Sequence, residues 1–195
     1  CPCCNNQEET QQHIISCPSP QMEKARAHYI DIYKKSLEDV GTPAKLIQAF
    51  TQGIREWIIN QTTTRQFPSS TSLFLDGKHP LQAAYLEQTN PIGWDQFLRG
   101  RLSRRWGDAY GEQFPDSTKA EQLLWLSDVV RINMDFYLAM WESRNAVVHG
   151  QDQDEVRRKQ LHQLKMEVTQ EYRRYHKDPF IISREQSRLF DSRTM

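Results

Sequence analysis

Apolar side chains recur at three- and four-residue steps along most of the chain, which is the spacing of amphipathic helices. Residues 20–40 form the first such segment, and its stripe consists of Met22, Ala25, Tyr29, Ile32 with Tyr33, and Leu37. Gly41 ends this segment, and Thr42 followed by Pro43 predicts the N-cap and the first residue of a second helix. The stripe of that second helix consists of Leu46, Phe50, Ile54 and either Trp57 or Ile58.

The middle of the chain is less regular. Residues 61–78 lack a helical period and are rich in Ser and Thr with Pro and Gly, so they predict a long loop. A short helix is expected over 80–88, and a further helical region over 94–113 is expected to break near Gly100. Ser117 is then the predicted N-cap of the next helix, with Glu121 one residue beyond the usual capping-box position.

The longest helix is expected over 118–149, with Gly150 directly after its end. Its predicted core face consists of Leu123, Leu126, Val130, Met134 or Asn133, Tyr137, Trp141 and Val148, and is widened by Leu124, Phe136 and Met140. A last helix over 152–175 presents Leu161, Leu164, Val168, Tyr172 and Tyr175 and ends before Pro179. Together these elements predict an all-α fold, an irregular helical bundle over 19–178 followed by a loosely held tail at 179–195.

Composition narrows the classes of function. Acidic and basic residues number 25 each, so any site for a polyanion must be a local one. The mean hydropathy is −0.77, and no apolar run approaches the roughly 18 residues that span a bilayer. No leader peptide is recognisable, so we expect an intracellular protein, cytoplasmic or nuclear, without a membrane partner. Because the chain begins with Cys1, which already belongs to a motif, we expect it to be a fragment of a longer protein.

All four cysteines lie in the first seventeen residues, CPCCNNQEETQQHIISC, together with one histidine. Cys1 and Cys4 form a C-x2-C pair, and His13 and Cys17 are four residues apart, so they share a face if the segment is helical. This spacing predicts a tetrahedral zinc (Zn²⁺) site in a knuckle over 1–18, with Cys3 as a spare or as a substitute for Cys1. Four protein ligands leave no open position for water, which makes the ion structural. Disulfides or unrelated free thiols are the alternatives.

The same stretch resembles the zinc-binding segment near the C-terminal end of many non-LTR reverse transcriptases, in which paired cysteines precede an E-(E/D)-T stretch, a histidine and a final cysteine. Here three residues, where four often stand, separate His13 from Cys17. The stretches at 92–106 and 140–150 are similar to segments that follow this finger in reverse-transcriptase-like proteins of diatoms and other algae. The resemblance implies that the polymerase domain lies upstream in the same polypeptide. This piece is then an accessory region that binds RNA or DNA and has no catalytic centre of its own.

An arginine-rich block, GWDQFLRGRLSRRWG, supplies the candidate nucleic-acid site. Arginines there can hold phosphates while exposed aromatic faces stack on bases. The candidate residues are Arg99, Arg101, Arg104, Arg105, Trp94 and Trp106. The alternative is that the aromatic residues are core and that the arginines are solvated or pair with acids such as Asp108 and Glu112.

A second block, ESRNAVVHG, resembles the R-N-x-x-x-H signature of HEPN domains, many of which cleave RNA without a metal. That resemblance assigns phosphate binding to Arg144, proton transfer to His149 and an orienting role to Asn145. On a regular helix, however, residues five apart diverge by about 140°. The alternative interpretation is a helix C-terminus with a glycine cap, where His149 interacts with the dipole and Arg144 pairs with Glu142 or a neighbouring acid. A protein-interaction bundle without chemistry is the third hypothesis for the whole chain.

Overall fold

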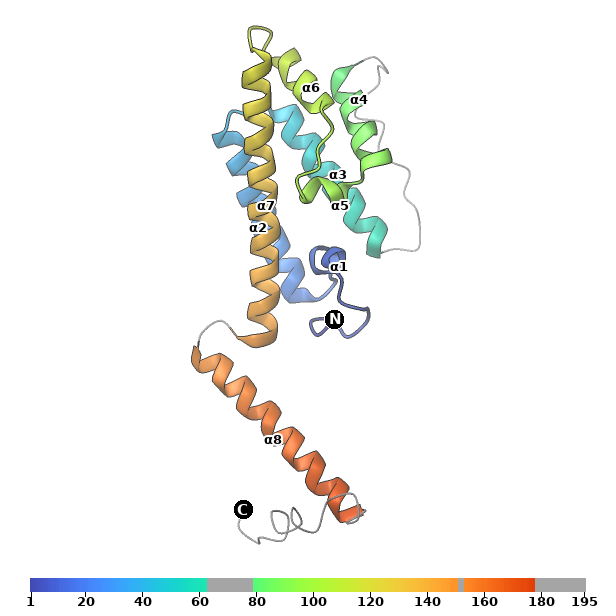
Figure 1. Cartoon of the computed structure of the whole chain (residues 1–195), viewed down its shortest axis with the longest axis vertical. Helices are drawn as coiled ribbons and strands as arrows, with labels where there is room; N and C mark the ends of the chain where they lie inside the picture. The colour runs from blue at the N-terminus through green and yellow to red at the C-terminus, as the bar shows by residue number, and fades with distance from the viewer. Residues whose placement is uncertain (63–78, 151–152, 178–195) are drawn as a thin grey trace. The chain divides into compact units, whose positions relative to one another are not determined.

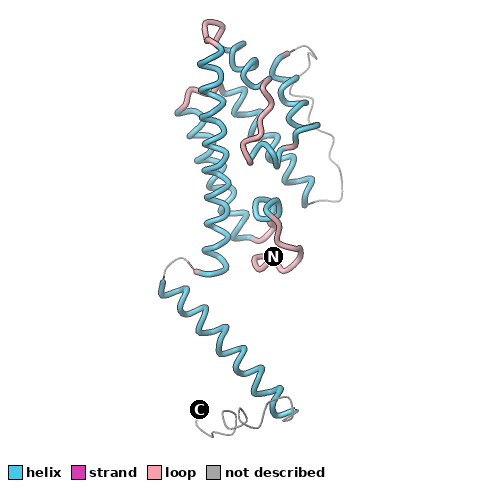
Figure 2. The backbone as a smooth tube through the Cα atoms, viewed as in Figure 1, coloured by secondary structure: helices cyan, strands magenta, loops and turns pink. Residues whose placement is uncertain are grey.

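The computed structural model describes residues 1–62, 79–150 and 153–177. All regular secondary structure of these residues is helical, and they contain no strand, which confirms the predicted all-α class (Figure 2). The chain divides into two units, Cys1–Asn145 and Ala146–Met195. The loop predicted for 61–78 falls almost entirely, and the tail predicted for 179–195 entirely, outside the described residues.

The described residues of the first unit form six shorter α-helices, one π-helical turn and most of a long helix (Figure 1). In chain order these are α1 (Gln11–Ser16), α2 (Pro20–Asp39), α3 (Ala44–Thr62), α4 (Pro80–Glu87), η2 (Gln88–Ile92), α5 (Trp94–Leu98), α6 (Arg105–Gln113) and α7 (Lys119–His149). The break expected near Gly100 is confirmed, because residues 99–104 separate α5 from α6. None of the helices in the described ranges is long and apolar enough to cross a membrane.

Local capping explains where several helices begin. Ser19 accepts a hydrogen bond from the Met22 amide at 3.4 Å, and Pro20 occupies the first turn of α2. The third helix begins at Ala44, one residue later than expected. The hydroxyl of the buried Thr42 accepts a hydrogen bond from the Trp125 indole at 2.9 Å, so this side chain ties the α2–α3 connection to α7.

The predicted N-cap of α7 is wrong by one residue. Thr118 Oγ1 accepts a hydrogen bond from the Glu121 amide at 3.2 Å, and the Glu121 carboxylate accepts one from the Thr118 amide at 2.7 Å. This reciprocal pair is a capping box, in which the residue three places after the cap returns the bond. Ser117 instead donates its hydroxyl to the Phe114 carbonyl at 2.7 Å and so belongs to the preceding turn.

Aromatic side chains fill the centre of the first unit. The ring of Phe50 lies 4.9 Å from that of Phe97 and 4.7 Å from that of Trp106, centroid to centroid. Gly53 of α3 makes room for Trp94, because a Cβ atom there would lie 2.0 Å from the indole ring. Helix α3 therefore approaches α5 at a distance that only glycine permits.

The core face of α7 differs from the predicted one. Its buried apolar side chains are Trp125, Val129, Ile132, Phe136 and Met140. Of the predicted face, Phe136, Met140 and Asn133, the alternative to Met134, are buried as expected. Leu123, Leu124 and Met134 are 64%, 67% and 50% exposed, so their assignment to the core is wrong. The physical reason is that α7 is apolar on nearly all sides, and periodicity alone does not select the side that packs. In Figure 1 α2 lies along α7, where Tyr33 contacts Asn133 and Phe136.

The described residues of the second unit form the end of α7 and helix α8 (Gln153–Lys177). Gly150 adopts a φ of 111° and donates its amide to the Ala146 carbonyl at 3.0 Å, which confirms the predicted glycine cap. Lys159 donates to the Val147 carbonyl at 3.0 Å and pairs with Glu155 at 3.1 Å. The apolar stripe predicted for this helix is exposed at Leu161, Leu164 and Val168.

Candidate metal centre

The first seventeen residues bring three cysteines and one histidine together. Ligand atoms of Cys1, Cys4, His13 and Cys17 all lie within 4.8 Å of one another, so the group can hold a metal ion. In the parts of the chain that the structure describes, no second group of this kind occurs. Cys3 lies outside the group. The four residues that the spacing predicts as ligands are therefore the four that the fold gathers.

Helix α1 sets the positions of two of these residues. Thr10 caps α1 by accepting a hydrogen bond from the His13 amide at 3.1 Å, and Cys17 is the residue directly after the helix ends. His13 and Cys17 consequently share one face of α1. The segment before the helix turns back, with the Asn5 amide donating to the Cys1 carbonyl at 2.8 Å, and so presents Cys1 and Cys4 to that face.

Distances within the group suit separate ligands around one ion. The Cys4 sulfur lies 3.2 Å from His13 Nε2, and the Cys1 sulfur lies 4.0 Å from that of Cys17. All four cysteines are free thiols, and a sulfur separation of 4.0 Å is about twice a disulfide bond. Tetrahedral thiolate and imidazole ligands at about 2.0 to 2.3 Å from an ion lie at comparable mutual distances. The residues present therefore fit a metal ion.

Burial and hydrogen bonding shift the pKa values of two of the candidate ligands toward the protonation states that bind metals. His13 is 5% exposed, and burial lowers the pKa of its imidazole, which favours the neutral form that coordinates metals. Burial acts to raise the pKa of the Cys4 thiol. Hydrogen bonds from the Asn6 backbone, the Cys17 side chain and the Gln7 backbone outweigh it, so that pKa is lowered. The pKa of Cys3 is raised, chiefly by burial.

The contacts that two arginines, Arg26 and Arg144, make around the ligands were not predicted from the sequence. Arg26 of α2 donates to the carbonyls of Ile15 and Cys17, and Glu9 forms an ion pair with Arg144. The acidic E-E-T stretch marks Glu9 as part of the motif, but nothing in the local sequence specifies which arginine it contacts. These contacts join residues 11 and 135 positions apart in the chain.

The arginine and tryptophan block has a mixed outcome. Trp94 and Trp106 are 5% and 0% exposed, so their predicted role in stacking on bases is wrong. Both rings are core residues, and their indole N–H groups donate to Thr89 at 3.1 Å and Gln88 at 3.2 Å. Gln88 itself is fully buried and also accepts the Ser103 amide at 3.0 Å, a role that the sequence did not reveal.

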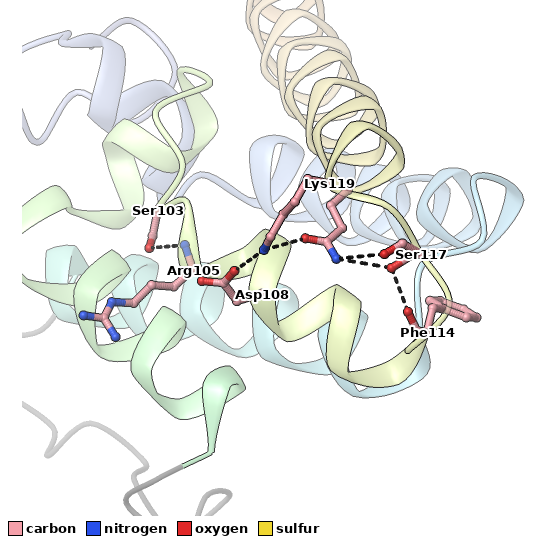
Figure 3. A network of polar contacts seen from close by, with 7 residues as sticks. Ser103, Arg105, Asp108, Phe114, Ser117 and Lys119 are labelled. Atoms are coloured by element: carbon pink, nitrogen blue, oxygen red, sulfur yellow. Dashed lines mark hydrogen bonds and ion pairs between the residues drawn. The ribbon is translucent and has the colours of Figure 1, made fainter.

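The four arginines of this block are exposed. Arg105 pairs with Glu87 at 2.6 Å, while its amide donates to the Ser103 hydroxyl. The acids considered as partners bind elsewhere, since Asp108 contacts Lys119 at 2.8 Å (Figure 3) and Glu112 contacts His79 at 3.3 Å. Among the ion pairs of the described residues, none involves Arg99, Arg101 or Arg104. Phosphate binding by these side chains stays a prediction.

The guanidinium of Arg144, which was predicted to bind phosphate, makes hydrogen bonds within the protein. Its Nε donates to Glu9 Oε2 at 2.9 Å, its Nη2 to Glu9 Oε1 at 2.5 Å, and its Nη1 to Asn145 Oδ1 at 3.0 Å. The guanidinium carbon lies 5.7 Å from the centre of the Trp141 ring. His149 is exposed at the end of α7 and belongs to the second unit. RNA cleavage by Arg144, Asn145 and His149 stays a prediction.

Comparison of the chain with protein-family models, with curated proteins and with solved structures found no match.

Proposed function

We propose that the chain is a zinc-stabilised helical region that binds RNA or DNA, an accessory part of a reverse-transcriptase-like protein whose polymerase domain lies upstream. The observation that carries the proposal is the convergence of Cys1, Cys4, His13 and Cys17 within 4.8 Å. Three thiols and one imidazole in a four-ligand set favour zinc over harder cations, which prefer oxygen ligands. The ion would be structural, because the four side chains occupy every position of a tetrahedral site.

Nucleic-acid binding is assigned to the exposed arginines between α5 and α6. Arg99, Arg101 and Arg104 carry positive charge into solvent without an ion-pair partner among the described residues. In a chain of balanced overall charge, such a local group is what phosphate binding requires. Because the neighbouring tryptophans are buried, the proposed contact is to the sugar-phosphate backbone and not to bases.

The metal part of the proposal is tested by counting the bound ion. We expect one zinc per chain by elemental analysis, and cobalt substitution is expected to give the absorption of a tetrahedral thiolate site. The variants Cys17→Ser and His13→Asn should lose the ion. Cys3→Ser is the matched control, since this neighbouring thiol lies outside the group, and it should retain full occupancy. Equal zinc content in all of these proteins, or none in the unaltered chain, would overturn the assignment.

Nucleic-acid binding is tested by its salt dependence. The triple variant R99Q/R101Q/R104Q should bind duplex DNA or RNA more weakly and with a shallower slope of log K against log [salt], by about 0.9 for each phosphate that the variant no longer neutralises. A triple variant of the exposed Lys24, Lys35 and Lys45 removes the same charge from α2 and α3. If both variants change the slope equally, the binding is not located at the arginines.

A further inference from the structure

Two arginines from different helices hold the segment that carries the metal ligands. Arg26 projects from α2 and donates through Nη1 to the carbonyl of Cys17 at 3.3 Å and to that of Ile15. Ile15 lies in the last turn of α1 and Cys17 directly follows the helix, so no further helical turn satisfies these carbonyls. Arg26 therefore holds the backbone at Cys17, the last of the four candidate ligands.

The second arginine acts on the other half of the segment. Arg144 of α7 binds the Glu9 carboxylate through two parallel hydrogen bonds, a geometry that fixes both position and orientation. The side chains are 11% and 26% exposed, so the pair is shielded more than an ordinary surface ion pair. Glu9 lies between Cys4 and His13 in sequence, so the pair anchors the loop that connects the two halves of the ligand set.

The charge of a loaded centre gives both arginines a further role. A divalent ion held by three thiolates and a neutral imidazole has a net charge of minus one, and the Glu9 carboxylate adds another negative charge nearby. Positive groups close to a partly buried anionic centre lower the cost of its desolvation.

We infer that Arg26 and Arg144 are positioning residues of the metal centre: they orient the ligand segment against α2 and α7 and balance the negative charge of the loaded site. The inference rests on the proposed metal binding. Neither guanidinium coordinates the ion. Each acts through a second group, Arg26 through backbone carbonyls and Arg144 through Glu9, as outer partners of metal ligands generally do.

Zinc affinity, measured by competition with a chromophoric chelator, tests this inference. Arg26→Gln, Arg144→Gln and Glu9→Gln should each weaken zinc binding by about 10- to 100-fold, the range found for outer-sphere partners. Because Glu9 and Arg144 act as one pair, the double variant E9Q/R144Q should resemble its single parents and not the product of their effects. Arg144→Lys keeps the positive charge but cannot form the two hydrogen bonds to one carboxylate, so it should bind zinc more tightly than Arg144→Gln and less tightly than the unaltered chain.

Matched controls separate this role from general destabilisation. Glu8→Gln removes an exposed acid next to Glu9, and Arg131→Gln removes an exposed, paired arginine from α7. Both should bind zinc as the unaltered chain does. The cobalt-substituted form gives a second readout, since a displaced ligand set changes the position and intensity of the absorption bands. A variant that fails to fold is replaced by its conservative partner, Arg26→Lys or Arg144→Lys.

The possible failures are distinct. If the unaltered chain binds one zinc ion and all three single variants bind it with unchanged affinity and unchanged cobalt spectra, the positioning role is wrong and the metal site stands. If the controls lose as much affinity as the test variants, the loss does not come from the Arg26 and Arg144 contacts, and the positioning role is again wrong. If the unaltered chain binds no zinc at all, the proposed function itself fails.

Discussion

Single polar side chains in the core fix how α7 sits on its neighbours in the first unit. Asn133 is fully buried, accepts a hydrogen bond from the Tyr33 hydroxyl at 2.8 Å and donates one to the Phe97 carbonyl at 2.8 Å. One residue thereby links α2, α5 and α7. Buried polar groups of this kind are expensive unless they are paired, so the arrangement favours one register of α7 over others.

Removal of the Tyr33 hydroxyl tests this link. Tyr33→Phe leaves the Asn133 amide oxygen buried without its donor, and should lower the free energy of unfolding by about 1–3 kcal/mol in urea denaturation. Tyr29→Phe, at a half-buried position of the same helix, serves as control and should have little effect. An equal loss in both variants would mean that the buried hydrogen bond is not the cause.

Tyr33 also predicts a dependence on alkaline pH. Burial raises the pKa of this phenol well above its usual value near 10. The folded state therefore holds the proton more tightly than the unfolded state, and stability is complete below pH 10 and falls as the pH rises above it. Unfolding measured between about pH 9 and 11 should show a steeper loss for the unaltered chain than for Tyr33→Phe. If the free energy of unfolding falls with pH equally in both proteins, Tyr33 is not the cause of the alkaline loss of stability.

The sequence predicted the metal ligands but not their supports, for a physical reason. Cys1, Cys4, His13 and Cys17 converge through one turn and one short helix, so their spacing alone contains the geometry. Arg26 and Arg144 reach the same segment only because α2 and α7 pack against it. Such contacts depend on tertiary structure, and no local pattern specifies them.

Among the elements, α7 shows where hydrophobic periodicity stops being informative. Its buried face holds Trp125, Ile132 and Phe136, while Leu123 and Leu138 on other faces are 64% and 53% exposed. Several stripes at helical spacing were available, and the choice among them depends on the shape of the surface offered by α2, α3 and α5. The lengths and limits of the helices were predicted closely, because caps and breakers are local signals.

The start of α7 provides a prediction at this scale. Thr118→Ala removes the hydroxyl that caps the Glu121 amide and should cost about 1 kcal/mol of stability. The neighbouring Ser117→Ala is the matched control, because the Ser117 hydroxyl caps no backbone amide of the helix: it donates to the Phe114 carbonyl and accepts from the Gln122 side chain. Chemical denaturation of both variants distinguishes the two positions. A larger loss for Ser117→Ala would return the cap to the residue that the sequence first indicated.

At the scale of the whole first unit, residues 1–17, which carry the candidate metal ligands and are called here the metal segment, pack into the core of the unit and do not form a separate domain. Ile14 and Ile15 of α1 are each 2% exposed, and Cys17 is completely buried. Helix α1 has six residues, too few to be stable alone in water, so its packing against the unit and its metal ligands must support each other. Metal binding is therefore expected to stabilise residues far from the ion.

Removal of the metal tests this coupling. If only the folded state binds zinc, a free concentration a thousandfold above Kd stabilises the unit by about 4 kcal/mol, and a chelator removes that contribution. The buried Trp94, Trp106 and Trp125 report on the core away from the ion. When the chelator is added, the thermal unfolding midpoint followed by tryptophan fluorescence should fall by as much as the midpoint followed by a probe attached to residues 1–17. A tryptophan transition that stays at the same temperature while the metal segment unfolds separately would show that the two parts are independent. Equal shifts by both probes would mean that one cooperative unit contains the ion, α1 and the aromatic core.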